Sequence, residues 1–187
     1  MKVLNISYGS WGPDNCYAYL EKYGTFGAQK FLLLVSSHDA YDNMNFVPTV
    51  DVLPAYSSKQ FPLAIMELVD RYLMPATNKK TETPERMLAI NKKERNSVFN
   101  SGFGNFLSFC RSHNIPLLVY LHAEKEERIA GKYNAQGVEI INFCKQHNLP
   151  IIKELDYEMP ASAYRDVIHP NDAGQDYIFR ILKDTIL

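Results

Sequence analysis

An aspartate and a histidine near the end of the chain, Asp166 and His169, are separated by two residues, and Pro170 follows them. A residue before proline is driven toward extended geometry, so His169 is expected on a loop rather than inside a helix. An aspartate three residues earlier can bond one ring nitrogen and fix the tautomer. The other nitrogen is then free to take a proton from a hydroxyl, as in hydrolases. The plainer alternative is an aspartate that stitches the loop beside an incidental histidine.

Apolar runs alternate with helical patterns and predict the elements that would position this pair. Strands are predicted at residues 2–7, 31–35, 116–121 and 150–152, and helices at 14–23, 63–73, 97–113, 135–147 and 172–187. The runs FLLLV and PLLVYL are typical of strands buried on both faces. This order predicts one α/β domain over residues 1–187, a three-layer α/β/α sandwich around a parallel sheet. The polar tract 75–95 is expected to be a solvated excursion.

Further polar and aromatic residues lie where the ends of parallel strands would form a ligand crevice. His38 and Asp39 follow the first continuous apolar run, and His122 follows the second. Trp11 and Tyr41 lie on nearby loops and could stack on a sugar ring or an acyl group. We therefore predict that Asp39, His122 and the two aromatic residues line a substrate site. The alternatives are capping or hydrogen bonding by the polar residues and core packing by the aromatic ones.

A metal site is the competing interpretation of these loops. His38, Asp39, Asp42, Asp166 and His169 are side chains that could hold a divalent ion and activate water. No HxH or HxxxH spacing supports that set, and orientation of the imidazole explains the aspartate before His169 equally well. The prediction is therefore that no metal or other cofactor is bound.

Three stretches of the chain resemble conserved blocks of the SGNH (GDSL-type) ester hydrolases. Residues 164–175 (YRDVIHPNDAGQ) resemble the last block, which carries the Asp and the His of a Ser-His-Asp triad. Residues 5–12 (NISYGSWG) resemble the second block, a strand followed by a glycine-bearing turn. Residues 36–39 (SSHD) resemble the third block, usually written Gly-x-Asn-Asp. The matches follow the family's order and span nearly the whole chain.

The resemblance implies a flavodoxin-like SGNH-hydrolase fold and the hydrolysis of small acyl or acetyl esters, with carbohydrate esters among the substrates. It implies that His169 and Asp166 are catalytic. It also implies an oxyanion hole formed by the turn at Gly9 and Ser10 together with His38, which stands where the family has an asparagine. A neutral imidazole can donate one N–H to an oxyanion.

The family's first block, Gly-Asp-Ser, has no counterpart in this chain. That block carries the nucleophile and precedes the second by several tens of residues, whereas only four residues precede Asn5. The usual first strand and its serine are therefore expected to be missing, as in an N-terminally truncated hydrolase. The alternative is a non-catalytic binding or scaffold domain of the same fold. Ser10, within a glycine-flanked turn, is the candidate substitute nucleophile.

Composition limits the class of partner. The chain has 187 residues, 46% of them hydrophobic, and a net charge of -1, which argues against a nucleic-acid or membrane-surface binder. Neither GxGxxG nor GxxxxGK[ST] occurs, which disfavours nucleotide binding. Cys110 and Cys144 fall in apolar helical patterns and are predicted to be buried free thiols. The expected partner is a small-molecule or carbohydrate ester, in the cytoplasm if the N-terminus is complete.

Overall fold

The computed structural model describes residues 2–9, 11–43, 60–69, 73 and 98–186. The chain divides into two compact units, Met1–Met44 with Val98–Leu187, and Asn45–Ser97. Within the second unit the short helix α2 (Ala64–Leu68) lies inside the helix predicted at 63–73. The predicted excursion at 75–95 lies outside the described residues. The prediction of one domain over 1–187 stays a prediction.

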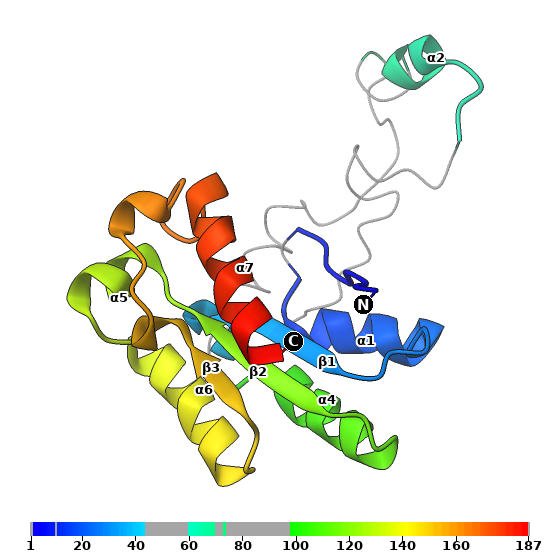
Figure 1. The fold of residues 1–187 in the computed structure, drawn as a ribbon. Helices are drawn as coiled ribbons and strands as arrows, with labels where there is room; N and C mark the ends of the chain where they lie inside the picture. The colour runs from blue at the N-terminus through cyan, green and yellow to red at the C-terminus, as the bar shows by residue number, and fades with distance from the viewer. Residues whose placement is uncertain (1, 10, 44–59, 70–72, 74–97, 187) are drawn as a thin grey trace. The chain divides into compact units, whose positions relative to one another are not determined.

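A parallel sheet forms the centre of the first unit (Figure 1). Its three strands run in the order β1 (Phe31–Ser36), β2 (Leu117–His122) and β3 (Ile151–Lys153). The register places Ser36 opposite His122, so β1 and β2 end at the same level. The segments that follow the strands therefore emerge together at the carboxyl edge of the sheet. The predicted α/β class and parallel sheet are confirmed.

Helices cover both faces of this sheet (Figure 1). Helices α4 (Ser101–Ser112) and α6 (Ala135–Gln146) pack on one face with α1 (Pro13–Tyr23), and α7 (Asp172–Ile186) packs on the other. The larger core joins alternate residues of β1 and β2 to residues of α1, α4 and α6. Its members include Leu33, Val35, Val119, Leu121, Leu20, Phe103, Phe106, Leu107, Cys110, Ile140 and Cys144. A smaller core joins β2 and β3 to α7: Tyr120, Ile152 and Ile181, with Leu118, Ile178 and Leu182. Cys110 and Cys144 are buried and free, as predicted.

Strand β1 differs from the prediction of a strand buried on both faces. Leu33 and Val35 are buried, but Leu32 is 36% exposed and Leu34 is 49% exposed. The reason is that α7 packs on β2 and β3 rather than on β1. In the described part of the chain β1 also pairs with β2 alone.

Residues 2–9 form no strand, so the strand predicted at 2–7 is wrong. Val3 and Leu4 are 75% and 49% exposed, and no sheet ladder forms in this segment. An extended segment needs the hydrogen bonds of a neighbouring strand to be stable in water. The apolar pattern of residues 2–7 predicts a strand, but it cannot show whether another strand pairs with it. Among the described residues no strand does.

Smaller differences concern the helices. Helix α1 begins at Pro13, one residue before the predicted start, and Asp14 lies in its first turn. In α6 the residues that face inward include Ile140, whereas Val138 is 44% exposed. A short helix, α5 (Lys125–Ala130), forms in a charged run for which no element was predicted. No helix in the described part of the chain is long and apolar enough to cross a bilayer.

Gly102 marks a close approach between α1 and α4, which carries a testable prediction. A Cβ at Gly102 would lie 2.2 Å from the backbone N of Asp14, whereas a Cβ at Gly104 would meet no atom within 4 Å. Alanine is favoured over glycine in a helix by about 1 kcal/mol, but overpacking costs about 1–3 kcal/mol. We expect Gly102→Ala to lower the free energy of unfolding by about 2 kcal/mol and Gly104→Ala to raise it by up to about 1 kcal/mol. Urea denaturation measures both, and equal effects would contradict the close approach.

Candidate functional site

Asp166 and His169 form the hydrogen-bonded pair that their spacing predicts. Nδ1 of His169 lies 2.8 Å from Oδ2 of Asp166, while Oδ1 of Asp166 accepts the backbone N–H groups of His169 and Ile168 at 2.7 and 2.9 Å. These backbone bonds, followed by the bond from the ring, hold the pKa of Asp166 well below its ordinary value. The carboxylate is therefore ionised and accepts a hydrogen bond from the Nδ1–H of the ring. The His169 side chain is 62% exposed, and its Nε2 has no partner in the described part of the chain.

A short loop between β3 and α7 presents this pair. Tyr164 and Pro170 close the loop through an antiparallel bridge. Asn171 caps α7 by accepting the N–H of Gly174 at 3.1 Å, which confirms the predicted start of the last helix. A Cβ on Gly174 would lie 2.3 Å from the carbonyl oxygen of Ala163, so glycine is required where the helix meets the loop.

The loop is held against the carboxyl end of β2. The backbone N–H of Lys125 donates to the carbonyl oxygen of Val167 at 2.9 Å. Nε2 of His122 lies 2.7 Å from the carbonyl oxygen of Ile168, which precedes the catalytic candidate His169. The dyad therefore lies at the edge of the sheet where a crevice was expected.

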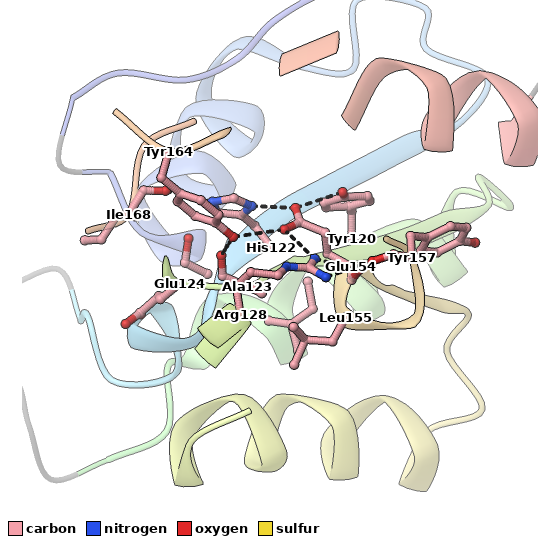
Figure 2. A network of polar contacts seen from close by, with 12 residues as sticks. Tyr120, His122, Ala123, Glu124, Arg128, Glu154, Leu155, Tyr157, Tyr164 and Ile168 are labelled. Carbon is pink, nitrogen blue, oxygen red and sulfur yellow. Dashed lines mark hydrogen bonds and ion pairs between the residues drawn. The ribbon is translucent and has the colours of Figure 1, made fainter. Parts of the chain in front are cut away.

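A buried polar network holds the His122 ring at Nδ1, its other nitrogen (Figure 2). Nδ1 of His122 lies 2.5 Å from Oε2 of Glu154, which is fully buried. The hydroxyl of Tyr120 donates to the same oxygen at 2.9 Å, and Nη2 of Arg128 donates to Oε1 at 3.2 Å. The hydroxyl of Tyr164 donates to the carbonyl of Ala123, which directly follows β2, and so ties the dyad loop to this segment a third time.

The partners of His122 fix its charge. A carbonyl oxygen and a carboxylate only accept hydrogen bonds, so both ring nitrogens donate and His122 is an imidazolium. Burial by itself lowers the pKa of His122, but the hydrogen bond and charge of Glu154 outweigh burial and leave the pKa raised. Burial by itself raises the pKa of Glu154, but the bonds from His122, Tyr120 and Arg128 leave it lowered. Glu154 is therefore a buried anion that faces two cations.

His38 lies in the short 3-10 helix η1 (Ser37–Ala40) that follows β1, and it faces Glu124. Its backbone N–H and its Nδ1 lie 3.2 and 3.1 Å from Oε1 of Glu124. The hydrogen bond to Glu124 raises the pKa of His38. It also places the proton of the neutral ring on Nδ1 and leaves a lone pair on Nε2. A neutral His38 therefore cannot donate from Nε2 to an oxyanion, and only its protonated form can fill the predicted role.

The predicted oxyanion turn lies in an exposed segment. Gly9 is exposed in a turn, and Ser10 is outside the described residues. Trp11 packs between Tyr8 and Tyr19, with ring centroids 5.9 and 5.7 Å away. In the described part of the chain no hydrogen bond or ring contact joins Gly9 or Trp11 to the dyad. Their predicted roles stay predictions.

The other predicted lining residues have partners within the protein. Oδ2 of Asp39 accepts the backbone N–H of Ser36 at 2.7 Å, which caps η1. The hydroxyl of Tyr41 donates to Glu139 of α6, and its ring packs against the core. His122 is only 3% exposed with both nitrogens bonded, so it supports the dyad loop rather than offering a polar group to a substrate.

Glu154 and Arg128 are the residues that the sequence did not single out. Leu121 pairs with Lys153, so the next step of the same register places His122 opposite Glu154. A signal for Glu154 was available in the sequence, because His122 and Glu154 stand at the ends of two apolar strands that could pair. Arg128 gave none, because its charged run resembles a solvated surface.

At the carboxyl edge of the sheet, the segment 122–125 thus bonds both to the dyad loop and to His38. The arrangement offers a histidine base with an ionised partner, and it offers a second histidine held by its own carboxylate. In comparisons with known proteins, no family model, no curated protein and no solved structure matches this chain.

Proposed function

We propose that the protein is an SGNH-type ester hydrolase that acts on small acyl or acetyl esters, including those on carbohydrate. The observation that carries the proposal is the pair of Asp166 and His169, in which an ionised carboxylate holds Nδ1 and leaves Nε2 exposed. This is the arrangement of a general base that takes a proton from a nucleophilic hydroxyl. The chemistry needs no cofactor.

The sheet supports the finer part of the proposal, a flavodoxin-like fold in which no counterpart of the family's first strand lies beside β1 among the described residues. In the SGNH family that strand is central, so its loss should uncover a neighbouring strand. Among the described residues β1 pairs with β2 alone, and its unpaired edge supports such a gap.

In the proposed reaction the Oγ of a nucleophilic serine, for which Ser10 is the candidate in this chain, attacks the ester carbonyl carbon. Nε2 of His169 takes the proton of the serine hydroxyl in the same step. Asp166 stabilises the resulting imidazolium, which then gives the proton to the departing alcohol oxygen. Water cleaves the acyl-enzyme by the same route, so the serine and the imidazole are restored. The turn at Gly9 and protonated His38 are the proposed oxyanion donors. Ser10 either joins that turn or serves as the substitute nucleophile.

A non-catalytic domain of the same fold is the second candidate. The observation that favours it is the lack of a serine bonded to His169 among the described residues. Ser37, at the end of β1, is fully buried, and its Oγ donates to Glu127 at 2.6 Å. It cannot reach an exposed base.

A fluorophosphonate probe and an acetyl ester distinguish the two candidates. The hydrolase proposal expects one labelled serine, located by mass spectrometry of the peptides, and turnover above the background rate. Label that is lost in Ser10→Ala identifies Ser10 as the nucleophile. The matched control is His113→Ala, which removes another exposed histidine and should change neither result. Absence of both label and turnover would overturn the hydrolase proposal in favour of the binding domain.

A further inference from the structure

Three side chains with metal-ligating atoms gather on the turn that follows β1. One ligand atom from each of His38, Asp39 and Asp42 lies within 4.8 Å of the others, and all three side chains are half-buried. An imidazole nitrogen with carboxylate oxygens suits zinc and similar divalent ions. We propose that these residues bind a divalent metal ion, with zinc as the reference ion. The three residues belong to the competing metal set of the sequence, for which no HxH or HxxxH spacing gave support.

Glu124 prepares His38 for this role. Its carboxylate accepts from Nδ1 at 3.1 Å and from the His38 backbone N–H at 3.2 Å, so one residue fixes both the ring and its turn. In the neutral ring the lone pair then lies on Nε2, which has no partner in the described part of the chain. Histidines that bind metal commonly donate their other ring N–H to a carboxylate in this way.

The two aspartates are fixed in different ways. Oδ2 of Asp39 accepts the Ser36 backbone N–H at 2.7 Å, which leaves Oδ1 for a ligand bond. Asp42 is held through its backbone, because the fully buried Asn100 donates to its carbonyl oxygen at 2.7 Å. The Asp42 carboxylate makes no hydrogen bond within the described part of the chain. Two carboxylates are thus held close together, and a cation between them would relieve their repulsion.

The geometry needs only a small adjustment. Ligand atoms around a tetrahedral ion with bonds of about 2.0–2.1 Å lie about 3.3 Å apart. Side-chain rotations that bring the three atoms up to about 1.5 Å closer than their present limit of 4.8 Å would therefore give them this spacing, with a fourth position left for water. A bound ion would occupy Nε2 of His38, so metal binding and the oxyanion role of that nitrogen exclude each other.

Calorimetric titration of the metal-stripped full chain with zinc chloride tests the proposal. We expect one site in the parent protein, and at least tenfold weaker binding in Asp42→Asn and in His38→Gln. Glu124→Gln keeps all three ligands but removes the carboxylate behind the ring, so binding should weaken by about 10–100-fold. The control His113→Gln/Asp184→Asn removes one exposed histidine and one exposed aspartate elsewhere and should bind as the parent does.

Two results would overturn the proposal. One is a parent protein that binds zinc no more tightly than Asp42→Asn. The other is a loss of affinity in the control equal to that in the ligand variants, since zinc would then be bound by scattered surface groups. Thermal melts of every variant without metal show that each one is folded. The titration measures heat of binding rather than turnover, so failure of the hydrolase proposal leaves this test intact.

Discussion

Replacing Glu154 by glutamine should lower the free energy of unfolding by about 3–5 kcal/mol, the cost of removing one partner of a buried ion pair. Glu154 is fully buried and faces the His122 imidazolium and the Arg128 guanidinium. A glutamine can accept a hydrogen bond from one of them, but it neutralises neither. Typical domains have stabilities of about 5–15 kcal/mol, so urea denaturation should show a large shift of the midpoint.

The loss should depend on pH in a defined direction. The pKa of His122 is raised by folding, so its contribution to stability is complete below about pH 6.5 and disappears as the pH rises through the raised value. The pKa of Glu154 is lowered, so its contribution is present above about pH 4.3 and is lost as the pH falls through the lowered value. The gap between the parent and Glu154→Gln should therefore be widest between these limits and narrow at alkaline pH, where His122 is neutral.

Two further variants separate charge from packing. Glu126→Gln changes an exposed glutamate of α5 and should alter stability by no more than about 0.5 kcal/mol. The double variant His122→Gln/Glu154→Gln removes one of the two stranded cations and should recover part of the loss. A double variant that is less stable than Glu154→Gln, with no pH dependence in either, would show that shape rather than charge holds this region together.

The predictable parts of the fold are the helices and strands in which one face of the element is buried and the other is exposed. In α4 the apolar periodicity puts Phe103, Phe106 and Leu107 on one face, and all three lie in the core, because a single helix face decides their burial. The loop position of His169 was predictable for a local reason as well, since Pro170 restricts the residue before it. The Asp166 bond then follows from a separation of three residues.

The parts that were not predictable depend on distant segments. FLLLV is the same string whether or not a helix covers its second face, and the exposure of Leu34 follows from where α7 packs. The network likewise joins residues 34 and 26 positions apart in the chain, Tyr120 to Glu154 and Arg128 to Glu154. A charged run has the same composition in water and in a buried ion pair, so only the fold reveals which one it is.

Asp166→Asn should lower kcat/KM for an acetyl ester by about 10²–10⁴-fold, the usual contribution of a general base. Oδ1 of Asp166 accepts the backbone N–H groups of Ile168 and His169, and an asparagine oxygen can keep both bonds. Its amide nitrogen would then replace Oδ2 and face Nδ1 of the ring. Two donors cannot pair, so the proton of the ring moves to Nε2, and the base loses the lone pair that the reaction needs.

His169→Ala should lower kcat/KM by at least about 10³-fold, since it removes the base itself. The control is Asp176→Asn, an exposed aspartate of α7 that pairs with Arg180, and it should leave the rate unchanged. Steady-state kinetics and thermal melts of all three variants distinguish catalysis from folding. If His169→Ala lost activity while Asp166→Asn kept it, the role of Asp166 would be limited to its hydrogen bonds with the backbone of the loop. Equal losses in folded Asp166→Asn and His169→Ala would instead show that the carboxylate acts through the ring. The asparagine keeps the backbone hydrogen bonds of the loop and changes only which ring nitrogen carries the proton.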